Sequence, residues 1–178
     1  KPNPEGPVFI SYCWDDGKKY ANKINALLRA IGLRVWRDIY DMPANNMAQA
    51  VREVLNNKTS SAVLVVTKKA GKSTFMKKNE IPLLIQLAKD TSFPFVIVNA
   101  LSEKNRSINY SRPDEILETN SKVLEESKQY DIRDEDGIKA LLTELLKARL
   151  LYVKEKMQKE DRQYFTIDVE SRTPATTF

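Results

Sequence analysis

Glu80 is the residue with the clearest chemical potential, because it is a carboxylate where the surrounding pattern calls for an apolar side chain. It precedes Leu84 by four residues and Leu87 by seven, so all three share a helix face that should be buried. Charged side chains are rarely buried without a partner. An ionised carboxylate at a helix start could stabilise positive charge at the anomeric carbon of a ribose, as in glycoside cleavage. The alternative is a structural glutamate that the helix dipole favours and that lies half in water.

The residue types that are missing narrow the chemistry further. The 178 residues include no histidine and one cysteine, Cys13. Histidine bases, catalytic triads and most zinc sites are therefore excluded, and we expect no metal at the site. A single cysteine cannot form an internal disulfide framework, and it fits the reducing conditions of the cytoplasm. Cys13 could be a reactive thiol, although a lone cysteine at a strand end is more often structural.

Composition and charge are those of an ordinary soluble globular protein. Apolar residues make up 42% of the chain and charged residues 30%, and the net charge is +5. This mild basicity permits an anionic ligand but does not call for nucleic acid as a partner. The sequence contains no apolar stretch long enough to span a bilayer and no secretory signal, so we expect no membrane partner and a cytoplasmic location.

The segment from Val8 to Asp16 is the one around which the other elements are expected to gather. Its apolar run without alternation is typical of a strand buried on both faces, as in parallel sheets. Ligands bind outside the carboxyl ends of such strands, which is where Tyr12 and the following residues would lie. A helix is predicted next, with Asp15 or Asp16 as its cap and Gly32 at its end.

Strands and helices are predicted to alternate along the rest of the chain. The segment 33–37 alternates, which suits an edge strand or a strand with one polar face, whereas 61–67 is the clearest buried strand. Further strands are expected at 93–99 and 130–132, and helices at 47–55, from about Glu80 to 88, and at 138–153. Pro82 restricts the start of the middle helix to within a residue or two of Glu80. The segment 100–127 is polar and has no strong period over most of its length. This order predicts a parallel α/β sheet with right-handed crossovers.

Four segments resemble the boxes of one known family in the right order and spacing. They are Phe9-Ile10-Ser11-Tyr12 with a following acid, Val35-Trp36-Arg37-Asp38 with Met42-Pro43 after it, Ser61 to Thr67, and Thr74 to Glu80. The family is that of TIR domains, the Toll and interleukin receptor homology fold, and the resemblance covers roughly Val8 to Leu151. It implies a flavodoxin-like fold of five parallel strands flanked by helices.

The resemblance also implies an activity and a set of site residues. Many members of the TIR family cleave NAD+ at the nicotinamide–ribose bond, and the family's catalytic glutamate matches Glu80. By the same resemblance, the substrate-binding residues are Ser11, Tyr12, Cys13, Trp14, Asp38, Met42, Thr74 and Met76. NAD+ would be the substrate of a hydrolase or cyclase that needs no cofactor. Other TIR domains would be its partners, with self-assembly activating it in immune or defence signalling.

Some residues depart from the enzymatic pattern, and a second function class therefore stays open. Met76 stands where many enzymatic members have Trp, and Cys13 and Trp14 stand where several have Arg. Non-enzymatic members are adaptors that signal by TIR–TIR association, and this chain could be one. A phosphoacceptor receiver on the same fold is disfavoured, because the aspartate it needs at the end of the third strand is Thr67. The lysines at 68–78 could attract a pyrophosphate or belong to a solvated loop.

The tail is expected to lie outside the TIR domain, which we place at residues 1–158. Charged residues at 154–162 suit a helical linker, and residues 159–178 would hold a linker and the first strand of a further domain. Apolar and polar residues alternate from Gln163 to Arg172, which predicts a strand with one buried face. A lone strand needs a pairing partner, which an edge of the TIR sheet could supply or, in the interpretation we prefer, a further domain.

Overall fold

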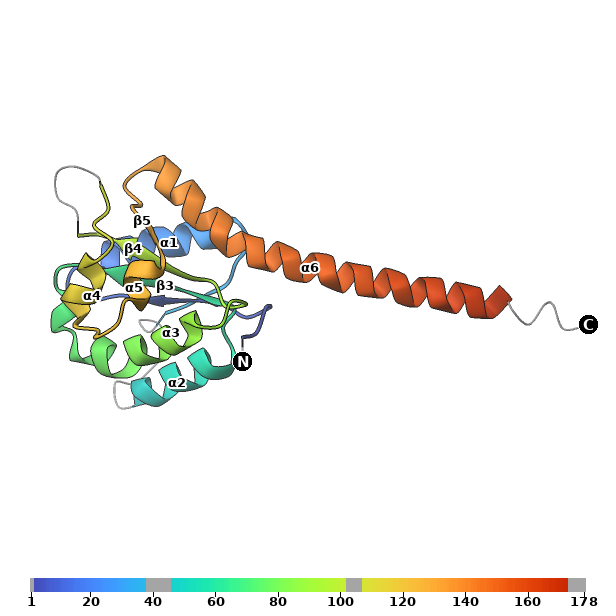
Figure 1. Cartoon of the computed structure of the whole chain (residues 1–178), viewed down its shortest axis with the longest axis horizontal. Helices are drawn as coiled ribbons and strands as arrows, with labels where there is room; N and C mark the ends of the chain where they lie inside the picture. Colours follow the sequence, from blue (N-terminus) through green and yellow to red (C-terminus); the bar gives the residue numbers. More distant parts are fainter. Residues whose placement is uncertain (1, 38–45, 102–106, 173–178) are drawn as a thin grey trace, which may run out of the picture.

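A five-stranded parallel sheet forms the centre of the computed structural model (Figure 1). The structure describes residues 2–37, 46–101 and 107–172, without the side chains of 148 and 164–172. The strands are β1 (Val8–Ser11), β2 (Val35–Trp36), β3 (Ser61–Val66), β4 (Phe95–Asn99) and β5 (Lys128–Tyr130). They lie in the order β2-β1-β3-β4-β5, and every neighbouring pair is parallel. The predicted sheet is therefore confirmed, as is the edge position of the second strand.

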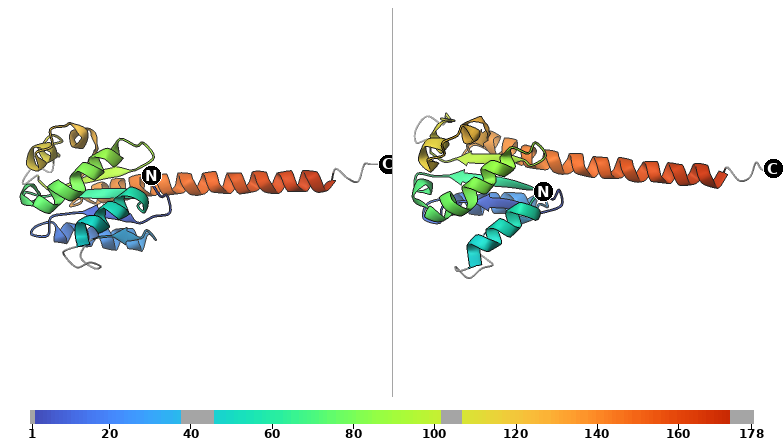
Figure 2. Two further views of the ribbon diagram at one scale, coloured as in Figure 1. Left: turned by 90° about the horizontal axis from the view of Figure 1, so that it is seen from below. Right: turned by 60° about the horizontal axis from the view of Figure 1, so that its bottom comes forward.

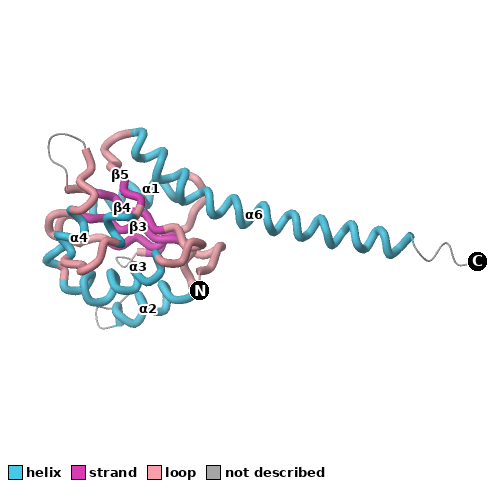
Figure 3. The backbone as a smooth tube through the Cα atoms, in the orientation of Figure 1, coloured by secondary structure: helices cyan, strands magenta, loops and turns pink. Residues whose placement is uncertain are grey.

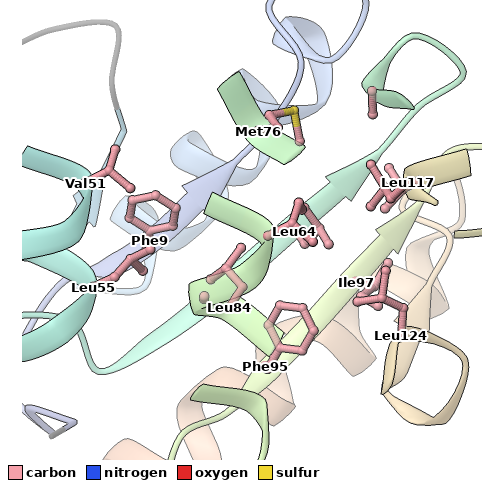
Figure 4. Close-up of a cluster of buried hydrophobic side chains, with 14 of the residues drawn as sticks. Phe9, Val51, Leu55, Leu64, Met76, Leu84, Phe95, Ile97, Leu117 and Leu124 are labelled. Atoms are coloured by element: carbon pink, nitrogen blue, oxygen red, sulfur yellow. The ribbon is translucent and has the colours of Figure 1, made fainter. Parts of the chain in front are cut away.

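Successive residues of the central strands point to opposite faces of the sheet, and both faces are buried. Phe9, Leu64 and Ile97 belong to one core cluster, and Ile10 and Val63, which pair in register, belong to the other. Figure 4 shows the first cluster, where side chains of β1, β3 and β4 meet those of the helices beneath. Burial on both sides explains the apolar runs that identify these strands in the sequence.

The helices form a layer on each face of the sheet (Figures 1 and 2). The elements α1 (Lys18–Ala30) and the first turns of α6 (Glu135–Arg172) cover one face, through residues such as Ile24 and Leu141. The opposite face is covered by α2 (Met47–Asn57) and α3 (Ile81–Ala88), with α4 (Arg112–Leu117) and α5 (Val123–Glu126) beside them. Figure 3 shows the same layers, with the strands between the helices.

Several element boundaries differ from the sequence prediction. The strand β2 has two residues, and β5 ends at Tyr130 instead of Ile132. The structure places Gln129 in the middle of β5, where it is buried and donates to the carbonyl oxygens of Tyr110 and Leu124. A buried glutamine satisfied in this way leaves no apolar signal in the sequence. The segment without strong period contains α4 and α5, which are too short to show a helical period but are anchored by Leu117 and Leu124.

The expected aspartate cap of α1 is wrong. The residue before the helix is Gly17, and no side chain caps the helix start. The Asp16 carboxylate instead accepts hydrogen bonds from the loop after β3, at the carboxyl ends of the neighbouring strands β1 and β3. The predicted end of the helix is correct, because Gly32 follows it with a φ of 83°, a conformation that glycine adopts without strain.

The helix that carries Glu80 begins earlier than the sequence indicates. The α-helix α3 starts at Ile81 with Pro82 in its first turn, as predicted. The chain before it is already helical, however, with Thr74 and Phe75 followed by a π turn at Met76–Glu80. In this turn the Ile81 N–H donates to the Met76 carbonyl, five residues back. The helix start with its free N–H groups therefore lies near Thr74 and not at Glu80.

The predicted strand in the tail is also wrong. Residues 163–172 continue α6, which runs unbroken from Glu135 to Arg172 and extends away from the body of the protein (Figure 1). The charged stretch 154–162 is helical, as expected. Extending an existing helix needs no new nucleus, so the helix overrides a local alternating pattern that pairs with no strand in the described part of the chain. The domain boundary at 158 stays a prediction.

Candidate functional site

A cavity of about 390 Å³ opens at the carboxyl ends of β1 and β3. It lies where the sequence pattern predicts a ligand site, outside the ends of buried parallel strands. The loop after β1, the start of α2, the loop after β3 and the π turn all contribute to its wall. Its lining residues are Tyr12, Cys13, Trp14, Asp15, Met47, Lys69, Lys72, Ser73, Phe75, Met76 and Glu80.

Glu80 lies in the wall of this cavity and is 2% exposed. The predicted burial of its helix face is confirmed, and the alternative of a carboxylate half in water is wrong. Glu80 is the last residue of the π turn and directly precedes α3, whose residues Ile81 and Leu84 pack into the core. The extra residue of the π turn therefore sets how Phe75 and Met76, which precede or open it, are turned relative to Glu80, and all three line the cavity.

Asp16 connects two loops of the cavity wall. Its carboxylate accepts a hydrogen bond of 2.5 Å from the Thr67 hydroxyl and one of 2.9 Å from the Lys69 backbone N–H. The loop after β1 is thereby fixed to the loop after β3. The sequence around Asp16 predicts a helix cap and does not indicate this role, because Thr67 is 51 residues away in the chain.

The loop after β3 presents two lysines to the cavity, Lys69 and Lys72. It forms a 3-10 turn at Ala70–Lys72, with Ala70 buried beneath it. Gly71 lies so close to α4 that an added Cβ would be 2.3 Å from the Ile116 carbonyl oxygen. Only glycine fits here, and the turn that holds both lysines is therefore tightly constrained. Ser73 follows and accepts a hydrogen bond of 3.3 Å from the Met76 N–H.

The sequence matches the family model for the TIR domain over residues 8–142. The protein belongs to the TIR domain family. No curated protein matches the chain. Among the residues that the structure describes, no helix has the length and apolar character needed to cross a membrane.

Solved TIR structures share the fold at low sequence identity. One is the activated Roq1 resistosome directly recognising the pathogen effector XopQ, whose TIR domains are 16% identical to this chain with a TM-score of 0.56. That match covers 78% of this chain and 98% of the other. A second is a metazoan TIR-STING receptor from C. gigas in complex with 2',3'-cGAMP, which is 14% identical with a TM-score of 0.56. That match covers 82% of this chain and 41% of the receptor chain.

The TIR fold brings some of the predicted substrate-binding residues together at the cavity and not others. Tyr12, Cys13, Trp14 and Met76 line it beside Glu80. Ser11 is fully buried and is not part of the lining. Thr74 does not line the cavity either, since it lies in a separate hollow with Gly71 and three lysines. Asp38 and Met42 fall outside the described residues. Ser73 and Phe75, the neighbours of Thr74, do line the cavity and were not among the predicted substrate-binding residues.

The inner wall of the cavity is built on buried side chains of the TIR sheet. The Tyr12 hydroxyl accepts a hydrogen bond of 3.4 Å from the buried Arg37, whose guanidinium also lies 5.1 Å from the Tyr12 ring centre. Burial raises the pKa of the Cys13 thiol, so Cys13 is held in its neutral form. Trp14, by contrast, is 52% exposed and lies at the rim. The cavity therefore has an apolar interior, one buried carboxylate, and an aromatic and two lysines at its edge.

Proposed function

We propose that this TIR domain cleaves NAD+ at the bond between nicotinamide and ribose, as an NAD+ glycohydrolase. The observation that carries the proposal is the carboxylate of Glu80, which is almost fully buried and lines a cavity at the carboxyl ends of the strands. Burying a charged group costs desolvation free energy, and the interactions that the group makes inside the protein seldom offset this cost enough to add stability. Carboxylates in such places are candidates for chemistry.

The chemistry needs a carboxylate and no general acid. The C1'–N bond of the pyridinium breaks, its electron pair stays with the nitrogen, and nicotinamide leaves as a neutral molecule. The positive charge that develops at C1' is stabilised by the carboxylate of Glu80, and water then adds to give ADP-ribose and a proton. A cyclic product would form if a nucleophile within the substrate replaced the water. A site without histidine is sufficient for either route.

The other residues of the cavity would position the substrate. Lys69 and Lys72 carry the positive charges that a diphosphate requires, and the constrained turn at 70–72 keeps them in place before substrate arrives. Trp14, at the rim, offers an exposed aromatic face on which a flat heterocycle would stack. Met76 and Phe75 supply the apolar wall.

We further propose that the enzyme works in the cytoplasm, in immune or defence signalling, and is activated by TIR–TIR association. The TIR domains of an activated resistosome are among the structures that it resembles. The competing proposal is a TIR adaptor that associates in the same way but has no turnover. The buried glutamate favours the enzyme, because an adaptor has no use for a carboxylate that faces a cavity and is hidden from partners.

The test is the release of nicotinamide from NAD+ by the wild type and by two matched variants. Glu80→Gln keeps the size of the side chain and removes its charge, and we expect it to lower turnover by roughly 100-fold or more. Asp15→Asn makes the same change at an exposed carboxylate of the same cavity and should keep most of the activity. Circular dichroism and thermal unfolding establish that both variants are folded.

Three outcomes would contradict parts of the proposal. Full activity in folded Glu80→Gln would remove Glu80 from the catalytic role. Absence of nicotinamide release by the wild type, at concentrations where the TIR domains associate, would favour the adaptor. Inhibition by a chelator that added metal reverses would contradict the expected metal-independence.

A further inference from the structure

The distal part of α6 carries an apolar stripe that nothing in the described chain covers. Leu141 and Leu145, in the first turns, are buried against the sheet. After them the helix leaves the body, and Figures 1 and 2 show it extending into solvent in every view. Large apolar side chains nevertheless continue along it, with Leu150 64%, Leu151 56%, Val153 41% and Met157 59% exposed.

Most of these residues follow the spacing of a coiled coil. Leu146, Leu150, Val153 and Met157 are separated by four, three and four residues, which is the alternation of the a and d positions of a heptad repeat. The sequence continues with the same spacing through Glu160 to Tyr164 and Ile167. These seven positions would form the contact line, or seam, of a coiled coil, and six of them are apolar over about three heptads. Leu151 is the exception, since it lies off this stripe.

The positions of the stripe beyond Leu146 face away from the nearest part of the body. The residues of this helix that line a hollow with Pro2 and Pro4 of the lead-in segment are Leu145, Arg149, Leu151, Tyr152 and Glu155, and none of them is Leu150, Val153 or Met157. The Arg149 guanidinium donates to the Pro4 carbonyl oxygen at 2.6 Å. The seam positions alternate with these residues along the helix and remain open to a partner.

We propose that α6 pairs with α6 of a second copy of this chain, as a parallel two-stranded coiled coil with Leu150, Val153 and Met157 in its seam. Each copy supplies the same stripe, so the two surfaces are complementary by symmetry. The seam would bury side chains that the single chain leaves in water, and this burial drives the association.

The charges beside the seam fit the parallel arrangement. With Leu150 and Met157 at a positions, Lys156 occupies a g position and Asp161 the following e position. In a parallel pair the g residue of one helix lies beside that e residue of the other, so Lys156 and Asp161 form two opposite-charge pairs. One like-charged pair, Arg149 with Lys154, falls at the point where the helix leaves the body and Arg149 is held by Pro4. Lys156 approaches Glu5 only loosely, at 3.7 Å and half exposed, and it stays available for a partner.

Glu160 makes the association weak and adjustable. It occupies the one polar position of the seam, where two carboxylates of a dimer would lie close together. A polar residue at a single seam position costs stability and fixes the register of the pair. The coiled coil is therefore expected to form reversibly, and replacing Glu160 by leucine should tighten it.

A parallel pair places both TIR domains at the same end of the coiled coil. Their local concentration rises without any contact between the TIR surfaces themselves. This arrangement does not depend on the proposed NAD+ cleavage, since an adaptor would gain from it equally.

The test is sedimentation equilibrium of the whole chain over a range of concentrations. We expect reversible dimerisation in the wild type, loss of the dimer in the double variant Leu150→Glu with Met157→Glu, and roughly tenfold tighter association in Glu160→Leu. Leu151→Glu is the matched control, because it places the same charge on an equally exposed leucine off the seam and should leave the dimer intact.

Cysteine cross-linking tests the parallel register. Met157→Cys brings two thiols together across the seam only if the helices are parallel and in register, so mild oxidation should give a covalent dimer. Lys159→Cys, on the outer face, should not cross-link. A chain that stays monomeric at every concentration, a dimer that Leu150→Glu with Met157→Glu leaves unchanged, or cross-linking at 159 without cross-linking at 157 would each overturn the proposal.

Discussion

Replacing Asp16 by alanine tests whether one carboxylate holds the cavity wall together. The substitution removes the acceptor of the Thr67 hydroxyl and of the Lys69 backbone N–H. Thr67 is buried, so its hydroxyl loses a partner that water replaces only in part, whereas the bond from the Lys69 N–H is exposed and water replaces more of it. The loop after β1 would also be released from the loop after β3, although the strands themselves keep their ladder.

The expected cost follows from these two bonds. A hydrogen bond to a charged group contributes about 1.5–3 kcal/mol when it is buried. Asp16 is half-buried and solvent screens it in part, so about 1 kcal/mol for each bond is the reasonable figure. The sum is roughly 2 kcal/mol, which in a domain of this size lowers the unfolding temperature by about 4–8 °C.

Thermal and urea unfolding measure this loss, with Asp15→Ala as the control. Asp15 is the adjacent aspartate and is exposed, so its removal should change the free energy of unfolding by less than about 0.5 kcal/mol. If the Asp16 and Asp15 variants unfold at the same temperature, the carboxylate bridge contributes nothing and the reasoning is wrong. A loss well above 4 kcal/mol would also refute it, because it would mean that the strands depend on Asp16.

Three further predictions concern other parts of the fold. Gly71→Ala should destabilise the protein by about 2 kcal/mol or more in urea unfolding, because its Cβ would overlap the Ile116 carbonyl oxygen; an unchanged midpoint would show that the turn shifts freely. Cys13 should react with a thiol reagent at neutral pH much more slowly than an exposed cysteine, since burial raises its pKa and leaves it only 6% exposed in the cavity wall; labelling as fast as that of an exposed thiol would contradict this. The hydrogen bond from Lys77 lowers the pKa of Glu118, so the pair stabilises the fold above the ordinary glutamate pKa and loses that effect as pH falls through the lowered value. An NMR titration should find the pKa of Glu118 restored by Lys77→Gln, and an equal value in both proteins would refute the assignment.

The sheet was predictable because its signal is local. The strands β1, β3 and β4 are buried on both faces and appear in the sequence as continuous apolar runs. The missed features depend on contacts between distant segments. Gln129 is satisfied by carbonyl groups of Tyr110 and Leu124, which no pattern around residue 129 reveals. The alternation after Gln163 predicts a strand only if a pairing strand exists. The segment is helical because it continues α6.

The candidate site was predictable to a similar extent. Glu80 was identified from its place on an apolar helix face, and its burial confirms that argument. Thr74, which the resemblance assigned to substrate binding, lies at the helix start and lines a different hollow, so its binding role stays a prediction. The bond between Asp16 and Lys69 spans 53 residues and could not be inferred from either segment alone.

The π turn at Met76–Glu80 has a consequence for how this helix tolerates changes in length. A π turn holds one residue more than an α turn, and each residue of an α-helix rotates the chain by about 100°. Deleting one residue from 77–79 would therefore allow a regular α-helix to form. Such a helix would be free of the bulge, but Phe75 and Met76 would be turned by about a quarter of a revolution relative to Glu80 and Leu84, whose own spacing is unchanged. The side chains that form the cavity wall beside Glu80 are thus selected by a count of backbone residues as much as by the identity of any one of them.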